Sequence, residues 1–159
     1  MSLYLRQFTY LCGKLIEMGT MEIFDPMVAY GSIDDISAMS LIKMVRNGIG
    51  FTTFDNFATK SPFSQYEWST YLHLSERTMQ RYRIEKRTFD PLQSEKIIEI
   101  ALFYNKGVEV FGTAENFNAW LETDNLALGK IKPKMLLDNS FGINMLRDEL
   151  TRIEYGILA

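Results

Sequence analysis

The sequence contains few of the residues that hold small or secreted proteins together. Among its 159 residues there is one cysteine, Cys12, and one histidine, His73. A single cysteine excludes a disulfide within the chain, and together the two residues offer too few ligands for a zinc site of the usual Cys/His kind. A chain of this length buries roughly two-thirds of the surface that its unfolded form exposes, so its core needs neither device.

Long apolar runs and secretion signals are also missing. The first thirty residues are rich in apolar side chains, but no run reaches the ~20 residues that a helix needs to cross a bilayer. The interrupting charges are Arg6, Lys14, Glu17 and Glu22. No small-residue cleavage site follows a clean apolar stretch. We therefore expect a cytoplasmic protein without a membrane partner.

Signals for strands, phosphate loops and catalytic groups are absent as well. No segment alternates between apolar and polar residues with hairpin turns on either side. Glycine pairs such as Gly48 and Gly50 follow no strand and lack the lysine-serine pair of a phosphate loop. His73, the natural candidate for acid-base chemistry near neutral pH, lies in an expected turn. We expect no enzymatic activity, no metal and no cofactor.

The signals that are present predict an all-α protein of about eight helices. Ser64 and Glu67 have the spacing of a capping box, and Ser75 is placed to cap a helix over Glu76–Glu85. Asp90-Pro91 begins a long helix that Gly112 ends. Further helices are expected over residues 5–16, from a cap at Asp34 or Ser37 to Gly48, and over residues 51–58, 114–121, 133–137 and 140–155.

These helices divide into three parts with a boundary near residue 90. Residues 1–31 form an extension, and packing against the rest of the chain is favoured there over a separate dimerisation arm. Residues 32–89 carry a helix-turn-helix pattern, and residues 90–159 form a second helical domain. In the helix before Gly48, the apolar positions are Ile36, Met39, Leu41, Ile42 and Val45.

Charge is unevenly distributed along the chain. The net charge is −3 and the isoelectric point is near 5.2, which argues against a protein that coats nucleic acid without specificity. Residues 75–87, however, contain five basic side chains against two acidic ones, whereas both flanks are acidic. This basic segment coincides with the second helix of the helix-turn-helix pattern, which in such motifs lies in the major groove of DNA.

The basic helix has side chains suited to reading and holding DNA. Arginine bonds guanine, glutamine bonds adenine, and threonine contacts the thymine methyl group. The residues of these types in the first half of the helix are Arg77, Thr78, Gln80 and Arg81. Those suited to neutralising phosphates are Arg83, Lys86 and Arg87. The alternative is a solvated helix face whose basic residues pair with Glu76 and Glu85.

The order of these motifs resembles a known family. The run from Tyr71 to Tyr82 resembles the helix-turn-helix of the Xre/MbcA/ParS antitoxins. Residues 119–121, 125–129 and 152–156 then resemble the family's C-terminal toxin-binding domain, and the likeness covers about residues 36–159. Two departures stand out: His73 replaces the glycine that relaxes the bend between the helices, and Lys130 replaces a second glycine after Gly129.

The resemblance implies an antitoxin paired with a RES-domain toxin that consumes NAD. Its C-terminal domain would cover the NAD pocket of the toxin, and its N-terminal part would form a homodimer that binds operator DNA and represses the operon. The implied toxin contacts are Asn125, Leu128, Gly129, Lys130, Arg152, Tyr155 and Gly156. For Leu128, as for Trp120 and Ile153, packing in the domain's own core is favoured over contact. The alternative function is a helix-turn-helix transcriptional regulator without a toxin partner.

Overall fold

The computed structural model describes residues 38–156, and the regular secondary structure of this part of the chain is helical. It contains seven α-helices, one short 3-10 helix and no β-strand, so the all-α prediction is confirmed there. The extension at residues 1–31, the helix expected at residues 5–16 and the caps at Asp34 and Ser37 lie outside the described residues. No helix of the described part is long and apolar enough to cross a membrane.

Most of the helix boundaries match the capping signals of the sequence. The elements in chain order are α2 (Ala38–Asn47), α3 (Phe51–Ala58), α4 (Gln65–Tyr71), α5 (Glu76–Glu85), α6 (Pro91–Phe111), α7 (Ala114–Glu122), η2 (Pro133–Leu136) and α8 (Ser140–Glu154). The long helix α6 begins at a capping box formed by Asp90 and Gln93, with Pro91 in its first turn. It ends at Gly112, whose φ of 78° is the left-handed value of a helix C-terminus.

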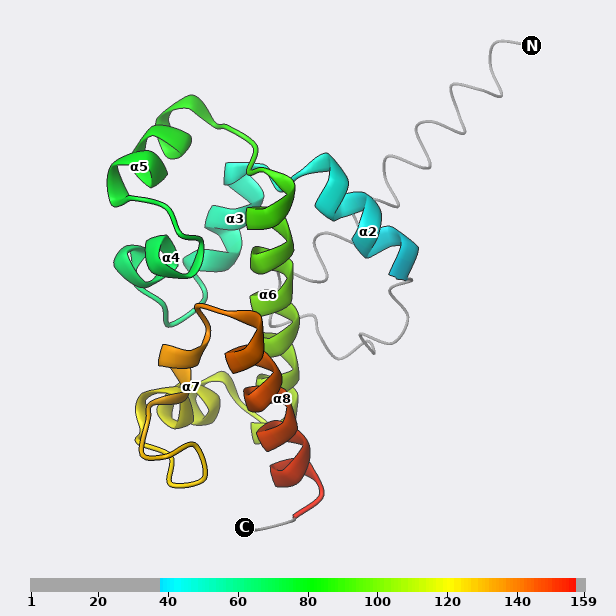
Figure 1. Cartoon of the computed structure of the whole chain (residues 1–159), viewed down its shortest axis with the longest axis vertical. Coiled ribbons are helices and arrows are strands. Elements are labelled where there is room, and N and C mark those ends of the chain that lie inside the picture. Colours follow the sequence, from blue (N-terminus) through cyan, green and yellow to red (C-terminus); the bar gives the residue numbers. More distant parts are fainter. Residues whose placement is uncertain (1–37, 157–159) are drawn as a thin grey trace, which may run out of the picture.

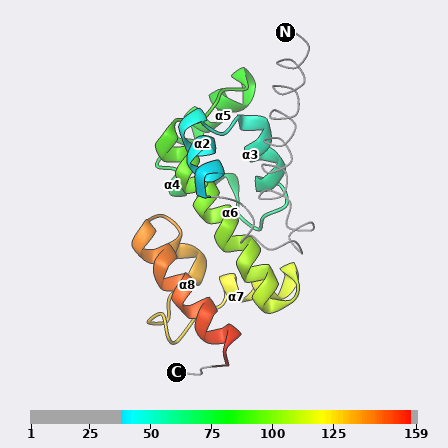
Figure 2. The same cartoon turned by 90° about the vertical axis from the view of Figure 1, so that its right-hand side faces the viewer.

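Helix α6 is the spine of the molecule. It contacts α2, α7 and α8 along its length. Figure 1 shows α3, α4 and α5 gathered around its N-terminal end, and α7 and α8 around its C-terminal end, and Figure 2 shows the same arrangement from the side. One continuous helix therefore spans both ends of the protein.

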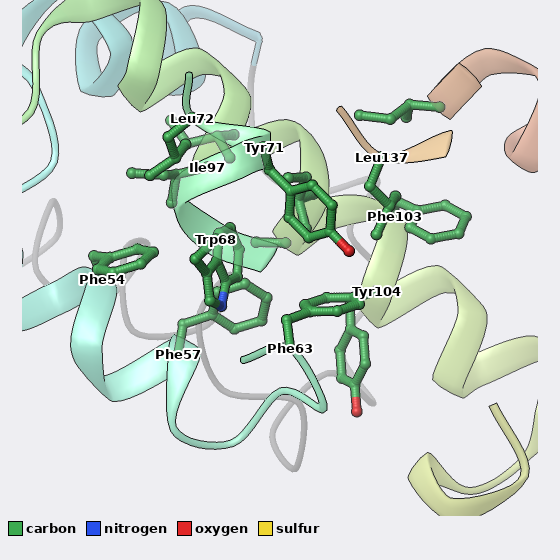
Figure 3. Packing of buried hydrophobic residues seen from close by; sticks show 14 of the residues in the cluster. Phe54, Phe57, Phe63, Trp68, Tyr71, Leu72, Ile97, Phe103, Tyr104 and Leu137 are labelled. Carbon is green, nitrogen blue, oxygen red and sulfur yellow. The ribbon is translucent and has the colours of Figure 1, made fainter. Parts of the chain in front are cut away.

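An aromatic cluster fills the core at the N-terminal end of α6. Trp68 of α4 is 1% exposed and meets four rings edge to face (Figure 3). Its centroid distances are 5.0 Å to Phe54, 5.7 Å to Phe57, 5.7 Å to Phe63 and 5.9 Å to Tyr71. Such pairs contribute about 0.5–1.5 kcal/mol each beyond the burial of their area, so this cluster fixes α3 against α4.

Tyr104 packs against core residues from both ends of the molecule. This α6 residue is fully buried, and its ring lies 6.0 Å from Phe57 and 6.1 Å from Phe63 on one side. On the other side it lies 5.4 Å from Phe117 of α7. Its hydroxyl bonds Oδ1 of Asn118 at 2.8 Å, so the polar atom is satisfied. The two ends of the protein thus share one hydrophobic core.

Helix α2 buries only part of its apolar surface. It ends before Gly48, which has the expected left-handed φ of 81°. Its apolar residues, however, do not all face inward: Met39 is 59% exposed, Ile42 is 39% exposed, and Met44 is its buried residue. Leu41 and Val45 are partly buried against the core. Because α2 lies on the outside of α6, only a narrow face of it reaches the core.

Candidate functional sites

The helix-turn-helix is built from α4, a short turn and α5, and both of its helix starts are capped as predicted. The backbone N–H of Glu67 donates to Oγ of Ser64 at 3.2 Å, and the N–H of Ser64 donates to Oε2 of Glu67 at 2.7 Å. Ser75 accepts a bond of 3.1 Å from the N–H of Thr78. These bonds satisfy N–H groups that a helix start leaves without intrahelical partners.

His73 forms the turn in a conformation that usually requires glycine. Its φ is 52°, in the left-handed region, and the N–H of Leu74 donates to the carbonyl of Ser69 at 2.9 Å to close the bend. Met79, 3% exposed, anchors α5 to the core. The departure from the family's glycine therefore leaves the helix-turn-helix geometry intact.

The first half of α5 presents free side chains to solvent. Arg77, Gln80 and Arg81 are exposed, and within residues 38–156 their side chains make no ion pair or hydrogen bond. Thr78 differs, because it is half-buried and its hydroxyl lies 2.9 Å from Oγ of Ser75. Thr78 therefore belongs to the cap of α5 rather than to its free surface.

The second half of α5 holds its arginines against the domain surface. Arg83 Nη2 lies 3.0 Å from Oδ1 of Asp55 on α3, and its guanidinium sits 5.7 Å from the ring centroid of Phe51. Both charged side chains remain partly exposed, at 53% and 39%. The pair orients α5 on α3 and still leaves guanidinium surface available to a phosphate.

Arg87 and Lys86 lie where α5 ends. Arg87 Nε is 3.8 Å from Oε2 of Glu85, and its guanidinium stacks 5.0 Å from the ring centroid of Tyr82. Lys86 ends the helix with a left-handed φ of 48° and an exposed side chain. The alternative prediction was that the basic residues of α5 pair with Glu76 and Glu85. Glu85 pairs with Arg87, but Glu76 makes no ion pair within the described residues.

At the other end of the molecule, Asn125 organises the loop between α7 and η2. Its Oδ1 accepts bonds from the N–H groups of Ala127 at 2.8 Å and Leu128 at 3.3 Å. Its backbone N–H donates to the carbonyl of Ile131 at 3.2 Å, and its carbonyl accepts from the N–H of Lys130 at 2.8 Å. The side chain of Asn125 therefore shapes the loop, as in an Asx turn.

The tip of this loop combines one buried side chain with two residues whose backbone has the left-handed conformation. Leu128 is 7% exposed and belongs to the core, which confirms the interpretation that favoured packing and leaves little of its side chain for a partner. Gly129 and Lys130 follow with φ of 78° and 63°, and both are exposed. Lys130 is accordingly an exposed basic residue at the tip of the loop.

The C-terminal end of α8 is tied to α6 by a lysine. Lys106 Nζ lies 2.8 Å from Oε1 of Glu154 and 3.4 Å from Oε1 of Glu109. The hydrogen bond to Glu154 is the main cause that raises the pKa of Lys106 above its ordinary value, against the opposing effect of burial. This contact fixes where the last turn of α8 lies.

The three remaining sequence-predicted contacts follow on that turn. Arg152 Nη1 bonds Oε2 of Glu149 at 3.2 Å, but half of the arginine side chain remains exposed. Tyr155 is 73% exposed, and Gly156 has a left-handed φ of 65°. The structure thus brings Arg152, Tyr155 and Gly156 together at one end of α8.

Sequence reasoning missed Lys134, which joins the two ends of the protein. Its Nζ lies 2.7 Å from Oε1 of Glu67 on α4 and also bonds Glu122 on α7. Its backbone carbonyl accepts a bond of 3.0 Å from the buried hydroxyl of Tyr71. Burial raises the pKa of Tyr71, which keeps that hydroxyl protonated as the donor. No local pattern signals a partner that lies more than sixty residues away.

Two family models match consecutive stretches of the chain. The antitoxin Xre-like helix-turn-helix domain matches residues 40–102, and the antitoxin Xre/MbcA/ParS C-terminal toxin-binding domain matches residues 106–156. The interval between them falls inside α6, whereas the division predicted from the sequence lies at its start, so the exact domain division stays a prediction.

Comparison with solved structures supports the same fold. A chain of the MbcT–MbcA toxin–antitoxin complex of M. tuberculosis is similar, with a TM-score of 0.52 and 16% sequence identity. The match covers 69% of this chain and 96% of that one. No curated protein matches the sequence. With both family models in their expected order, the chain belongs to the Xre/MbcA/ParS antitoxins and is an antitoxin with a helix-turn-helix domain and a toxin-binding domain.

Proposed function

We propose that this antitoxin neutralises a cognate RES-domain toxin that consumes NAD and, as a homodimer, represses its own operon through α5. The observation that supports both activities is that two separate surfaces are available for them. Helix α5, with its basic residues, and the end of α8 lie at opposite ends of α6 (Figure 1). The RES class and its NAD chemistry rest on the family resemblance described above.

The DNA contact follows from the surface of α5. Arg77, Gln80 and Arg81 reach solvent near the helix N-terminus, which is the part of a recognition helix that meets base edges. Arg83, Lys86 and Arg87 lie beyond them and carry the charge for phosphates. In a dimer, two such helices would occupy major grooves one helical turn of DNA apart, about 34 Å.

A double substitution tests the DNA contact. Arg77→Ala combined with Arg81→Ala should abolish the operator shift and reduce the salt dependence of any residual binding, because two phosphate- or base-contacting charges are lost. Lys130→Ala with Lys132→Ala is the matched control, since it removes the same charge at the opposite end. Operator binding that survives the α5 substitutions, or that falls equally in the control, would place recognition elsewhere.

The toxin contact is assigned to the surface that includes the end of α8. Arg152 and Tyr155 are of the residue types that anchor protein interfaces, and both are exposed. Gly156 and the loop residues Gly129 and Lys130 complete the proposed surface. Asn125 supports it by holding the loop, and Leu128 supports it from the core.

Enzyme inhibition tests the neutralising role. Titrating the cognate toxin with the antitoxin should suppress NAD consumption at a fixed stoichiometry, and deleting residues 155–159 should relieve this inhibition. The deletion begins after α8 so that the buried Leu150 and the ion pair between Glu154 and Lys106 both stay in place. Operator binding and circular dichroism should be unchanged in the shortened protein. Full toxin activity in excess wild-type antitoxin would refute the proposal.

A further inference from the structure

Helix α8 exposes large apolar side chains on the face that points away from the core. Phe141 is 85% exposed, Met145 is 50% exposed and Tyr155 is 73% exposed. Residues four, seven, eleven and fourteen positions after a given residue share one face of an α-helix, so these three lie on a single stripe. The stripe, called here the α8 face, consists of Phe141, Met145, Asp148, Arg152 and Tyr155.

The fold holds this face outward. The opposite side of α8 is buried through Ile143, Leu146 and Leu150. At the start of the helix the N–H of Gly142 donates to Oδ1 of Asn139 at 2.9 Å, and a side chain at Gly142 would collide with the backbone of Leu136. The helix therefore cannot rotate to bring Phe141 into the core.

The exposed stripe is unlike scattered surface apolar residues. Single exposed leucines or methionines are ordinary, but Phe141 and Met145 are adjacent, one turn apart, and continue toward Tyr155. Phe141 makes no ring contact within residues 38–156. The stripe thus begins with two neighbouring apolar side chains, continues through Asp148 and Arg152, and ends at an exposed aromatic ring, a mixture that is typical of protein interfaces.

We propose that the α8 face docks on the cognate toxin and that Phe141 is its apolar anchor. This inference rests on the proposed function and extends the toxin surface by about three helical turns from Arg152 and Tyr155. The toxin-binding family model includes the whole of α8. Aromatic and arginine side chains dominate the energy of many interfaces, and methionine adapts its shape to the surface it meets. The complementary toxin surface is an apolar pocket for Phe141 and, about three helical turns further along α8, an acidic group for Arg152.

A second copy of the chain is the less suitable occupant. A dimer on DNA must bring two α5 helices into neighbouring grooves, whereas α8 lies at the other end of the molecule in both views (Figures 1 and 2). Pairing two copies through the α8 face would leave their α5 helices far apart. The toxin is therefore the partner that fits.

The test compares Phe141→Ser and Met145→Ser in the full chain with Ile84→Ser as a matched control. Ile84 is 79% exposed on α5, at the opposite end of the molecule. Affinity for the cognate toxin should fall about tenfold or more for Phe141→Ser and less for Met145→Ser, and should be unchanged for Ile84→Ser. Thermal stability and operator binding of the free antitoxin should be unaffected, because Phe141 is already in solvent.

Three outcomes would overturn the inference or its basis. If Phe141→Ser binds the toxin as tightly as wild type while deletion of residues 155–159 abolishes binding, the toxin does not dock on the α8 face, but the antitoxin function stands. If Phe141→Ser lowers self-association in sedimentation experiments at unchanged toxin affinity, the face joins two copies of the chain. If the wild-type protein neither binds nor inhibits the toxin, the proposed function itself fails.

Discussion

At the residue scale, two turns keep a glycine-like backbone after the glycine has been replaced. His73 and Lys130 occupy the positions where the family resemblance has glycine, and both retain positive φ, at 52° and 63°. For a residue with a side chain this conformation costs roughly 1–2 kcal/mol, because Cβ approaches the following carbonyl oxygen. The fold therefore carries local strain at the turn before α5 and at the loop before η2.

Replacing His73 by glycine should stabilise the protein. Glycine relieves the left-handed strain, but it also gives the unfolded chain more conformational entropy. The balance of the two effects raises the free energy of unfolding by roughly 0.5–1 kcal/mol. Urea denaturation would show it as a higher midpoint at constant slope. His73→Ala keeps Cβ and so should leave the midpoint near that of wild type. An equal gain for alanine would mean that the imidazole, not the backbone, is the source of strain.

Gly107 is required for a different reason, namely space. A Cβ at this position in α6 would collide with the ring of Phe117 on α7. Gly107→Ala should lower the free energy of unfolding by about 1–3 kcal/mol, which is typical of overpacked cores. Gly50→Ala is the control, since no atom lies within 4 Å of a Cβ there. Thermal melts of the two variants separate the effects, and a wild-type melting temperature for Gly107→Ala would contradict this account.

At the element scale, the Lys134 contacts join α4 to α7 and η2. Burial opposes ionisation of Glu67, but hydrogen bonds from Lys134 and Ser64 outweigh it and hold the pKa of Glu67 below its ordinary value. Hydrogen bonds to Glu122 and Glu67 raise the pKa of Lys134. The contribution of Glu67 to stability is thus complete above the unfolded carboxyl pKa and disappears as pH falls through the folded value.

Glu67→Gln should therefore lose stability at neutral pH and converge with wild type in acid. Glutamine preserves the capping bond, as Gln93 does at the start of α6, so the difference isolates the ion pair with Lys134. Urea titrations from about pH 7 down to below the unfolded carboxyl pKa of about 4.3 would measure it, since the lowered folded pKa makes Glu67 gain its proton only below that value. Glu76→Gln, at a carboxylate without an ion pair among the described residues, should show no comparable convergence. A constant gap at every pH would exclude the ionic explanation.

The sequence predicted the elements better than their contacts. Ser64, Ser75 and Gly112 act on backbone groups within a few residues, so the boundaries of α4, α5 and α6 follow from local chemistry. The contacts of Lys134 and the outward face of α2 depend on which helices meet, and no local period encodes that. Helical spacing also cannot show that Phe141 on α8 faces away from the core, because both faces of that helix contain apolar residues.

At the scale of the whole molecule, the proposed DNA and toxin surfaces do not overlap. The recognition helix α5 and the α8 face lie at opposite ends of α6 (Figures 1 and 2). We therefore expect a ternary complex of operator, antitoxin and toxin. Adding the cognate toxin to operator-bound antitoxin should slow the band further in a native gel. Release of free operator at saturating toxin would show that the two partners compete.

The ring of Tyr104 has a consequence for the lifetime of the protein. Because it packs on Phe57 at one end and on Phe117 at the other, this ring joins the cores of the two halves into one. Opening of either end exposes aromatic surface that belongs to both, so a protease that captures the open chain destroys the whole protein. Turnover of this antitoxin would then end both proposed activities, repression and toxin neutralisation, in a single event.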